Sequence, residues 1–197
     1  LLKEEGLDER VFVHAITDGR DTDPQSGLGY IENVVSDENF GKTTLASICG
    51  RYYAMDRDKR WERTKLAYDL LVHGKGEKHR NFKDAMQASY DAGVTDEFIK
   101  PIVLAENAAV AEDDIVLCFN FRTDRGRQIT TALTQQDFAE QEMHTLDLNY
   151  YTMTEYDKTY KNVGVLFDGQ DLKNTLGEVL SANGKTQLRA AETEKYP

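Results

Sequence analysis

The stretch I-V-L-C-F-N-F at residues 115–121, followed at once by R-T-D-R-G-R at residues 122–127, decides the fold class. The apolar run has the length and the β-branched and aromatic content of a buried strand. The residues after it change to helical spacing, with Ile129 and Leu133 one turn apart. Strands that alternate with helices build parallel sheets. We therefore predict an α/β fold with a largely parallel sheet and helices on both faces, a three-layer sandwich.

The remaining predicted elements continue this alternation. Strands are predicted at residues 11–16, 43–49, 149–153 and 163–167, with a weaker one at 101–104 and a last one at 187–191. Helices are predicted at residues 28–40, 58–74, 82–92, 124–133, 134–143 and 174–182. The first six residues have the pattern of the last turn of a helix that ends at Gly6. We expect the chain to begin within a larger protein.

Charge and composition exclude several classes of partner. The 197 residues contain 24 Lys and Arg against 35 Asp and Glu, a formal charge of −11. An acidic chain repels nucleic acids and anionic membranes, and no apolar run approaches the roughly 18 residues of a membrane-spanning helix. Cys49 and Cys118 each lie in an apolar run, which is typical of reduced, buried thiols. We expect a cytoplasmic protein that binds neither nucleic acid nor membrane.

Arginines follow the carboxyl ends of several predicted strands. Ligands of open α/β sheets bind beyond these ends, so the side chains should meet at one edge. Arginine binds carboxylate and phosphate through two parallel hydrogen bonds, which predicts a site for a small, multiply charged anion. The alternative is that these arginines pair with nearby carboxylates such as Asp124, as we expect for Arg60 and Arg63. The candidate ligands of the anion are Arg20, Arg51, Arg57, Arg122 and Arg125.

The carboxylates after the first strand need a separate interpretation. Residues 18–23 do not form an EF-hand calcium loop, because its sixth and twelfth positions would be Asp23 and Gly29. We assign Asp21, which lies among the cations, a catalytic or ligand-orienting role, and Asp18 the role of an anchor for the turn. The histidines show no metal-ligand spacing, and His14 is expected to be a hydrogen-bonded core residue. No metal site is predicted in this chain.

Four stretches together resemble the cofactor-independent (2,3-bisphosphoglycerate-independent) phosphoglycerate mutases. They are V-F-V-H-A-I-T-D-G-R-D-T at residues 11–22, G-R-Y-Y-A-M-D-R-D-K-R-W-E-R at 50–63, F-N-F-R-T-D-R-G-R-Q at 119–128 and A-E-T-E-K-Y-P at 191–197. The resemblance implies that residues 1–169 are most of the inserted substrate-binding (transferase) domain. Residues 170–197 would be a linker and the start of a domain of the alkaline phosphatase superfamily. The chain would thus be a fragment of a two-domain enzyme.

The resemblance also implies an activity, an isomerase of glycolysis and gluconeogenesis that interconverts 3-phosphoglycerate and 2-phosphoglycerate. The reaction would pass through a phosphoserine intermediate on the other domain. The complete enzyme would use two Mn²⁺ (or Mg²⁺) ions bound by residues outside this chain and no 2,3-bisphosphoglycerate, and we expect it to be a monomer. The chain by itself should bind substrate but not turn it over.

The family's functional residues can be matched to positions in this sequence. Arg20 and Asp21 match a substrate-binding pair, and Arg51 and Arg57 match the arginines after the second strand. Arg122 and Arg125 match the pair that binds phosphate and carboxylate. Lys195, after the last predicted strand, matches an active-site lysine of the other domain. Thr123 stands where many relatives have proline, which should leave the charge arrangement unchanged.

Two alternatives to this function remain open at the level of sequence. One is a non-catalytic domain that binds a phosphorylated anion, and the other is a metal-dependent phosphomutase that acts on a sugar phosphate. The pair Arg122 and Arg125 favours the glycerate, because it suits a carboxylate as well as a phosphate. Five arginines and one aspartate would leave four positive charges for a ligand that carries about three negative ones.

Overall fold

The structure is a computed structural model that describes residues 2–167, 169 and 173–188. The chain divides into two compact units, Leu1–Phe167 and Asp168–Pro197. The assignment of residues 1–169 and 170–197 to two domains of an enzyme remains a prediction. Among the described residues, no helix is long and apolar enough to cross a membrane.

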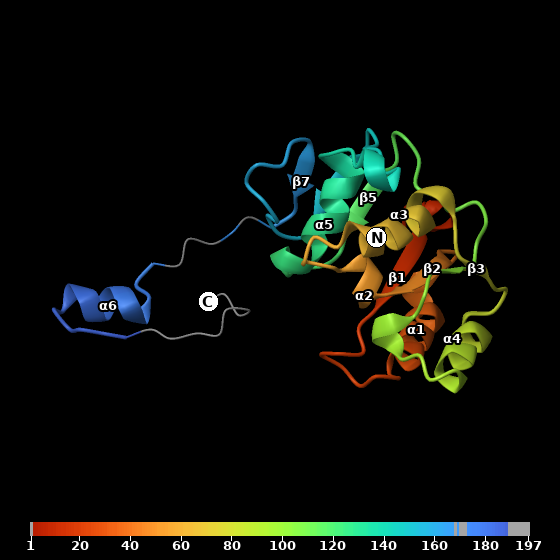
Figure 1. Cartoon of the computed structure of the whole chain (residues 1–197), viewed down its shortest axis with the longest axis horizontal. Coiled ribbons are helices and arrows are strands. Elements are labelled where there is room, and N and C mark those ends of the chain that lie inside the picture. The colour runs from red at the N-terminus through yellow and green to blue at the C-terminus, as the bar shows by residue number, and fades with distance from the viewer. Residues whose placement is uncertain (1, 168, 170–172, 189–197) are drawn as a thin grey trace. The chain divides into compact units, whose positions relative to one another are not determined.

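The first unit contains two sheets (Figure 1). In one, the strand order is β1-β2-β4-β3, with β1 (Phe12–Thr17) parallel to β2 (Thr44–Gly50). The other is wholly parallel and has the order β5-β6-β7, formed by Ile115–Cys118, Asn149–Thr152 and Val163–Val165. The predicted α/β class is confirmed, although the described strands form two sheets rather than one.

Strand β4 (Ile102–Val103) is antiparallel to β2 and parallel to β3 (Glu77–Lys78). Its direction follows from the residues before it, because the Ile99 carbonyl accepts a 2.8 Å hydrogen bond from the amide of Gly50 at the end of β2. The chain therefore enters β4 from the carboxyl end of β2 and must run back along it. This reversal makes the first sheet mixed.

Four of the helices in the first unit lie close to predicted ranges, although the first ends at Ser36 instead of residue 40, and a short helix at Arg51–Ala54 was not predicted. The helices are α1 (Gly27–Ser36), α2 (Arg51–Ala54), α3 (Trp61–His73), α4 (Phe82–Asp91) and α5 (Thr123–Thr134). Short 3₁₀ turns are present at Asp8–Arg10, Glu38–Phe40, Asp96–Phe98 and Ala139–Gln141. The Asn81 side chain caps α4 by accepting from the amide of Lys83.

Two local predictions were wrong. Residues 134–143 do not form a helix; Phe138 and Met143 pair across a turn, and the Asp137 carboxylate accepts from the amide of Thr145 instead of capping a helix. Residues 187 and 188 are not in a strand, while residues 189–191 of that predicted strand lie outside the described part of the chain.

Helices cover both faces of β2. Ile48 packs in a cluster that includes Ile31 of α1 and Met86 of α4, whereas its neighbour Cys49 packs in a cluster that includes Tyr68 of α3 and Leu133 of α5. Successive side chains of a strand point to opposite faces, so this division confirms the predicted covering of both faces. On β5, by contrast, Ile115 and Leu117 remain 79% and 48% exposed.

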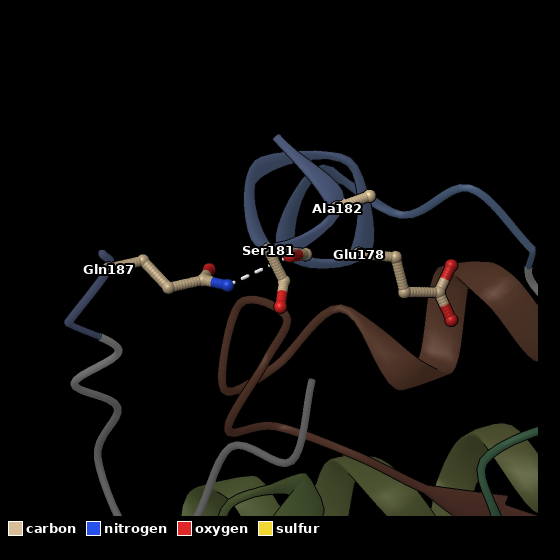
Figure 2. Close-up of a pocket in the computed structure, with 5 residues that line it drawn as sticks. Glu178, Ser181, Ala182 and Gln187 are labelled. Atoms are coloured by element: carbon tan, nitrogen blue, oxygen red, sulfur yellow. Dashed lines mark hydrogen bonds between the residues drawn. The ribbon is translucent and has the colours of Figure 1, made fainter. Parts of the chain in front are cut away.

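The second unit contains α6 (Leu176–Ala182). Thr175 and Glu178 form a capping box at its start, and Gln187 donates a 2.8 Å hydrogen bond to the Gly177 carbonyl (Figure 2). Glu178, Ser181, Ala182 and Gln187 line a hollow beside the helix. Its lining contains a carboxylate but no cation, so it does not suit an anion.

Candidate anion-binding site

The loops after β1 and β2 leave the first sheet at the same edge. Thr17, the last residue of β1, is in register with Gly50, the last residue of β2. The residues that follow, the loop from Asp18 and helix α2 from Arg51, therefore lie side by side. We call Arg20, Arg51, Arg57, Arg122 and Arg125 the arginine cluster.

Arg51 connects these two loops. Its Nη1 atom donates to Asp18 Oδ1 at 2.7 Å and to Asp21 Oδ2 at 2.9 Å, and only 5% of its side chain is exposed. Burial by itself lowers the pKa of Arg51, but the hydrogen bonds and charges of Asp21 and Asp18 outweigh burial and raise it. Arg51 is thus a fixed cation.

Asp18 anchors the turn, as predicted. Its Oδ1 atom accepts from the backbone amides of Arg20 and Asp21, both at 2.9 Å, in addition to Arg51. Burial raises the pKa of Asp18, but the two amides and the guanidinium lower it by more, and the net shift is downward. The carboxylate of Asp18 therefore fixes the backbone conformation of the turn that carries Asp21.

Asp124, in the first turn of α5, joins the third loop to the cluster. It accepts from Arg57 Nη1 at 2.9 Å and lies 3.5 Å from Arg122 Nη2. Arg122 in turn places Nη1 3.8 Å from Asp21 Oδ2. Burial raises the pKa of Asp124, but Arg57, Arg122 and Arg125 together lower it below its usual value. Cations and carboxylates thus alternate along one series of contacts, which runs through Asp18, Arg51, Asp21, Arg122, Asp124 and Arg57.

Arg125 is a partly buried cation of the cluster. Its Nη1 donates to the Met55 carbonyl at 3.0 Å. Burial lowers its pKa, and the charges of Arg51 and Arg57 lower it further, which places these three guanidinium groups within electrostatic reach of one another. Within the described part of the chain, the buried Nε atoms of Arg51 and Arg125 have no hydrogen-bond acceptor. Such unmatched donors are rare in folded proteins.

Arg20 lies at the outer edge, with 60% of its side chain exposed and Nη1 3.5 Å from the Glu97 carboxylate. Glu97 is a site residue that the sequence did not suggest, because it follows α4 rather than a parallel strand. The net charge expected for the site also needs correction, because carboxylates other than Asp21 lie among the arginines. Five arginines face Asp18, Asp21, Glu97 and Asp124, which leaves 5 − 4 = +1 instead of four positive charges.

The structure brings together Arg20, Asp21, Arg51, Arg57, Arg122 and Arg125, whereas Lys195 lies outside the described residues. Two residues expected to lie outside the site, Arg63 and His14, have local partners. Arg63 pairs with Asp56 at 3.5 Å and stacks on Tyr52, and His14 bonds Ser47 at 2.8 Å. In residues 2–167, 169 and 173–188, no three His, Cys, Asp or Glu side chains come together as metal ligands would.

Comparison with known proteins assigns the family. Residues 1–158 match the family model described as BPG-independent PGAM N-terminus. The chain belongs to this family. Its members among the curated proteins include 2,3-bisphosphoglycerate-independent phosphoglycerate mutases of Flavobacterium psychrophilum, 55% identical over 96% of this chain, and of Bacteroides fragilis, 57% identical over 95% of it. In both cases the chain spans 38% of the relative's length.

A solved structure shows the same family fold. Leishmania mexicana phosphoglycerate mutase, crystallised at low cobalt concentration, is similar to 88% of this chain with a TM-score of 0.71 and 27% identity. The match covers 34% of that protein. The chain is therefore similar to part of a longer mutase.

Proposed function

We propose that this chain is the substrate-holding part of a phosphoglycerate mutase that interconverts 3-phosphoglycerate and 2-phosphoglycerate. The observation that carries the proposal is the arginine cluster, in which Arg51 is fixed between Asp18 and Asp21 while Arg122 and Arg57 share Asp124. The names of the relatives support the substrate. The reaction is an isomerisation, in which a phosphoryl group leaves one hydroxyl of glycerate and returns to the other.

The residues divide the work of binding. Arg122 and Arg125 would bind the phosphate and carboxylate groups, because their planar forks match both anions. The Nε donors of Arg51 and Arg125, which have no acceptor among the described residues, support the binding of an anion that accepts hydrogen bonds here. Burial and then the charges of Arg51 and Arg57 lower the pKa of Arg125, and binding of a trianion would relieve this repulsion.

Asp21 is positioned for proton transfer. Its Oδ2 atom accepts a hydrogen bond from Arg51 at 2.9 Å and lies 3.8 Å from Arg122 Nη1, so both cations orient the carboxylate. Its Oδ1 atom would accept the hydrogen bond of the free glycerate hydroxyl. It would take up the hydroxyl proton when that oxygen receives the phosphoryl group. By the family resemblance alone, we also propose Lys195 as an active-site lysine.

The phosphorylated serine and the two Mn²⁺ or Mg²⁺ ions belong, in this proposal, to residues outside the chain. The described residues do not fit a metal ion, since they offer no cluster of ligands. The chain's own contribution is to hold the glycerate while it turns. Fixing a reactant in this way can supply several kcal/mol of barrier lowering. We further propose a cytoplasmic, monomeric enzyme; the free thiols of Cys49 and Cys118 support a reducing compartment.

Calorimetric titration with 3-phosphoglycerate tests the proposal. We expect binding that weakens with salt, that does not require metal and that is weakened by about 2 kcal/mol in Arg122→Ala. Arg63→Ala is the control. It also removes one guanidinium group, but this group pairs with Asp56, so the affinity for 3-phosphoglycerate should not change. Equal affinity for ribose 5-phosphate would indicate a sugar phosphomutase instead. Absence of binding by the chain would contradict a site complete within it.

A further inference from the structure

A buried carboxylate outside the arginine cluster holds the site loops in place. Asp96 is 1% exposed and lies in the 3₁₀ turn Asp96–Phe98 between α4 and β4. Its Oδ2 atom accepts from the backbone amide of Gly27 at 2.7 Å, and its Oδ1 atom accepts from the Tyr90 hydroxyl at 2.5 Å. Burial and then the hydrogen bond to Asp96 raise the pKa of Tyr90, so the hydroxyl remains the donor.

Asp96 caps α1 from a different part of the chain. Ser26 occupies the N-cap position of α1, but its hydroxyl donates to the Asp23 carbonyl and makes no cap. The carboxylate of Asp96 instead accepts from Gly27, the first residue of the helix, where a negative charge is favoured by the helix dipole. The end of the loop that carries Asp18, Arg20 and Asp21 is therefore tied to Asp96.

The backbone of Asp96 holds the same loop at two further points. Its amide donates to the Pro24 carbonyl at 2.9 Å, and its carbonyl accepts from the Thr17 hydroxyl at 2.7 Å. Thr17 and Gly27 bracket the loop, so both of its ends are bound to one residue. Close contact at Gly19 adds a third point, since a Cβ atom there would lie 2.7 Å from Asp96 Cβ.

The residues after Asp96 contact the end of β2 and helix α2. The Ile99 carbonyl accepts from Gly50, the Phe98 ring lies 5.1 Å from the Tyr52 ring, and the Glu97 carboxylate reaches Arg20. Residues 96–99 thus contact the loop after β1 and helix α2 together. These are the two elements that Arg51 joins through Asp18 and Asp21.

We propose that Asp96 is a positioning residue of the anion site, which fixes the Asp18–Asp21 turn against Arg51 from behind. This inference rests on the proposed function of the arginine cluster. Asp96 touches no cation of that cluster through its side chain in the described structure; it acts through Gly27 and Tyr90. Loss of its carboxylate would loosen the turn and so misplace Asp21 and Arg51.

The test compares Asp96→Ala with Asp69→Ala in calorimetric titrations with 3-phosphoglycerate, at a temperature where circular dichroism shows both folded. Asp69 is also a buried carboxylate, but its partners are Lys65, Lys75 and His73. We expect Asp96→Ala to weaken binding about tenfold, as loss of an outer support typically does, and Asp69→Ala to leave it within about twofold. Asp96→Asn, which can still accept from Gly27, should restore most of the affinity.

Tyr90→Phe keeps the inference testable if Asp96→Ala does not fold, because it removes only one hydrogen bond of the carboxylate. It should weaken binding severalfold while Asp69→Ala does not. Equal losses in the Asp96 and Asp69 variants, or full affinity in Asp96→Ala, would overturn the positioning role. Failure of the unsubstituted chain to bind would instead contradict the proposed function.

Discussion

The Nη1 atom of Arg51 lies 2.7 Å from the carboxylate of Asp18, across 33 residues of sequence. The guanidinium is buried, whereas Arg122, at the start of α5, keeps 51% of its side chain exposed. The two cations should therefore differ in what they contribute. Arg51 stabilises the fold and prepares the site, while Arg122 is available to the ligand.

This difference predicts the effect of removing each cation. Arg122→Ala should weaken 3-phosphoglycerate binding by about 2 kcal/mol and leave the melting temperature nearly unchanged. Arg51→Ala should weaken binding and also destabilise the fold, because Asp18 and Asp21 lose their buried partner. Calorimetric titration and thermal melts of both variants check the prediction. Equal melting temperatures for the two variants would contradict it.

Asp21→Asn should tighten binding of 3-phosphoglycerate while removing the proton acceptor. The net charge of the cluster with its carboxylates rises from +1 to +2, so affinity should increase and fall more steeply with salt. Titrations at two salt concentrations measure both effects. Asp23→Asn, in the same loop but hydrogen-bonded to the Gln25 amide, is the matched control. Weaker binding in Asp21→Asn would show that Asp21 acts chiefly as a ligand.

Asp124 predicts a pH dependence of stability. Its folded pKa is lowered, net of burial, by Arg57, Arg122 and Arg125. A group of this kind stabilises the fold above its unfolded pKa of about 3.9, and this stabilisation is lost as the pH falls through the folded value. Asp124→Asn should therefore melt below the unsubstituted chain at pH 7, and the difference should shrink below about pH 4. The exposed Asp84→Asn controls for the change in charge; a pH-independent difference for Asp124→Asn would exclude the ion pair as its cause.

Gly50 permits the close approach of residues 96–99 to the start of α2. A Cβ atom there would lie 2.4 Å from the Glu97 carbonyl oxygen. Gly50→Ala should destabilise the fold by about 1–3 kcal/mol and weaken ligand binding, because the loop must move away. Gly29→Ala, in α1 with open space around its Cβ position, should instead stabilise it by roughly 0.5–1 kcal/mol. Denaturant unfolding of both variants measures the contrast.

Local patterns predicted much of this fold because short-range chemistry governs it. The apolar run at 115–121 gave β5, although the strand ends at Cys118, and Asn81 marked the start of α4. The direction of β4 was not predictable, because it depends on the contact of Ile99 with Gly50. The same holds for residues 134–143, where Asp137 bonds to Thr145 beyond the predicted helix.

The site was predictable where it follows the strand order. Arg20, Arg51 and Arg122 were expected at one edge because each follows a strand, and ion pairs through Asp21 connect Arg51 with Arg122. Glu97 and Asp96 gave no such signal, because they belong to a turn before an antiparallel strand. Asp124 was interpreted only as a local partner of arginines, yet it joins α5 to Arg57. Contacts of this kind exist only once the chain has folded.

A crystal structure of the chain with 3-phosphoglycerate would test the central claim most directly. We predict phosphate and carboxylate oxygens within hydrogen-bond distance of Arg122 and Arg125. A glycerate hydroxyl should lie at Asp21, and Asp18 should still hold Arg51. A ligand bound elsewhere, with the cluster engaged only by its own carboxylates, would contradict it.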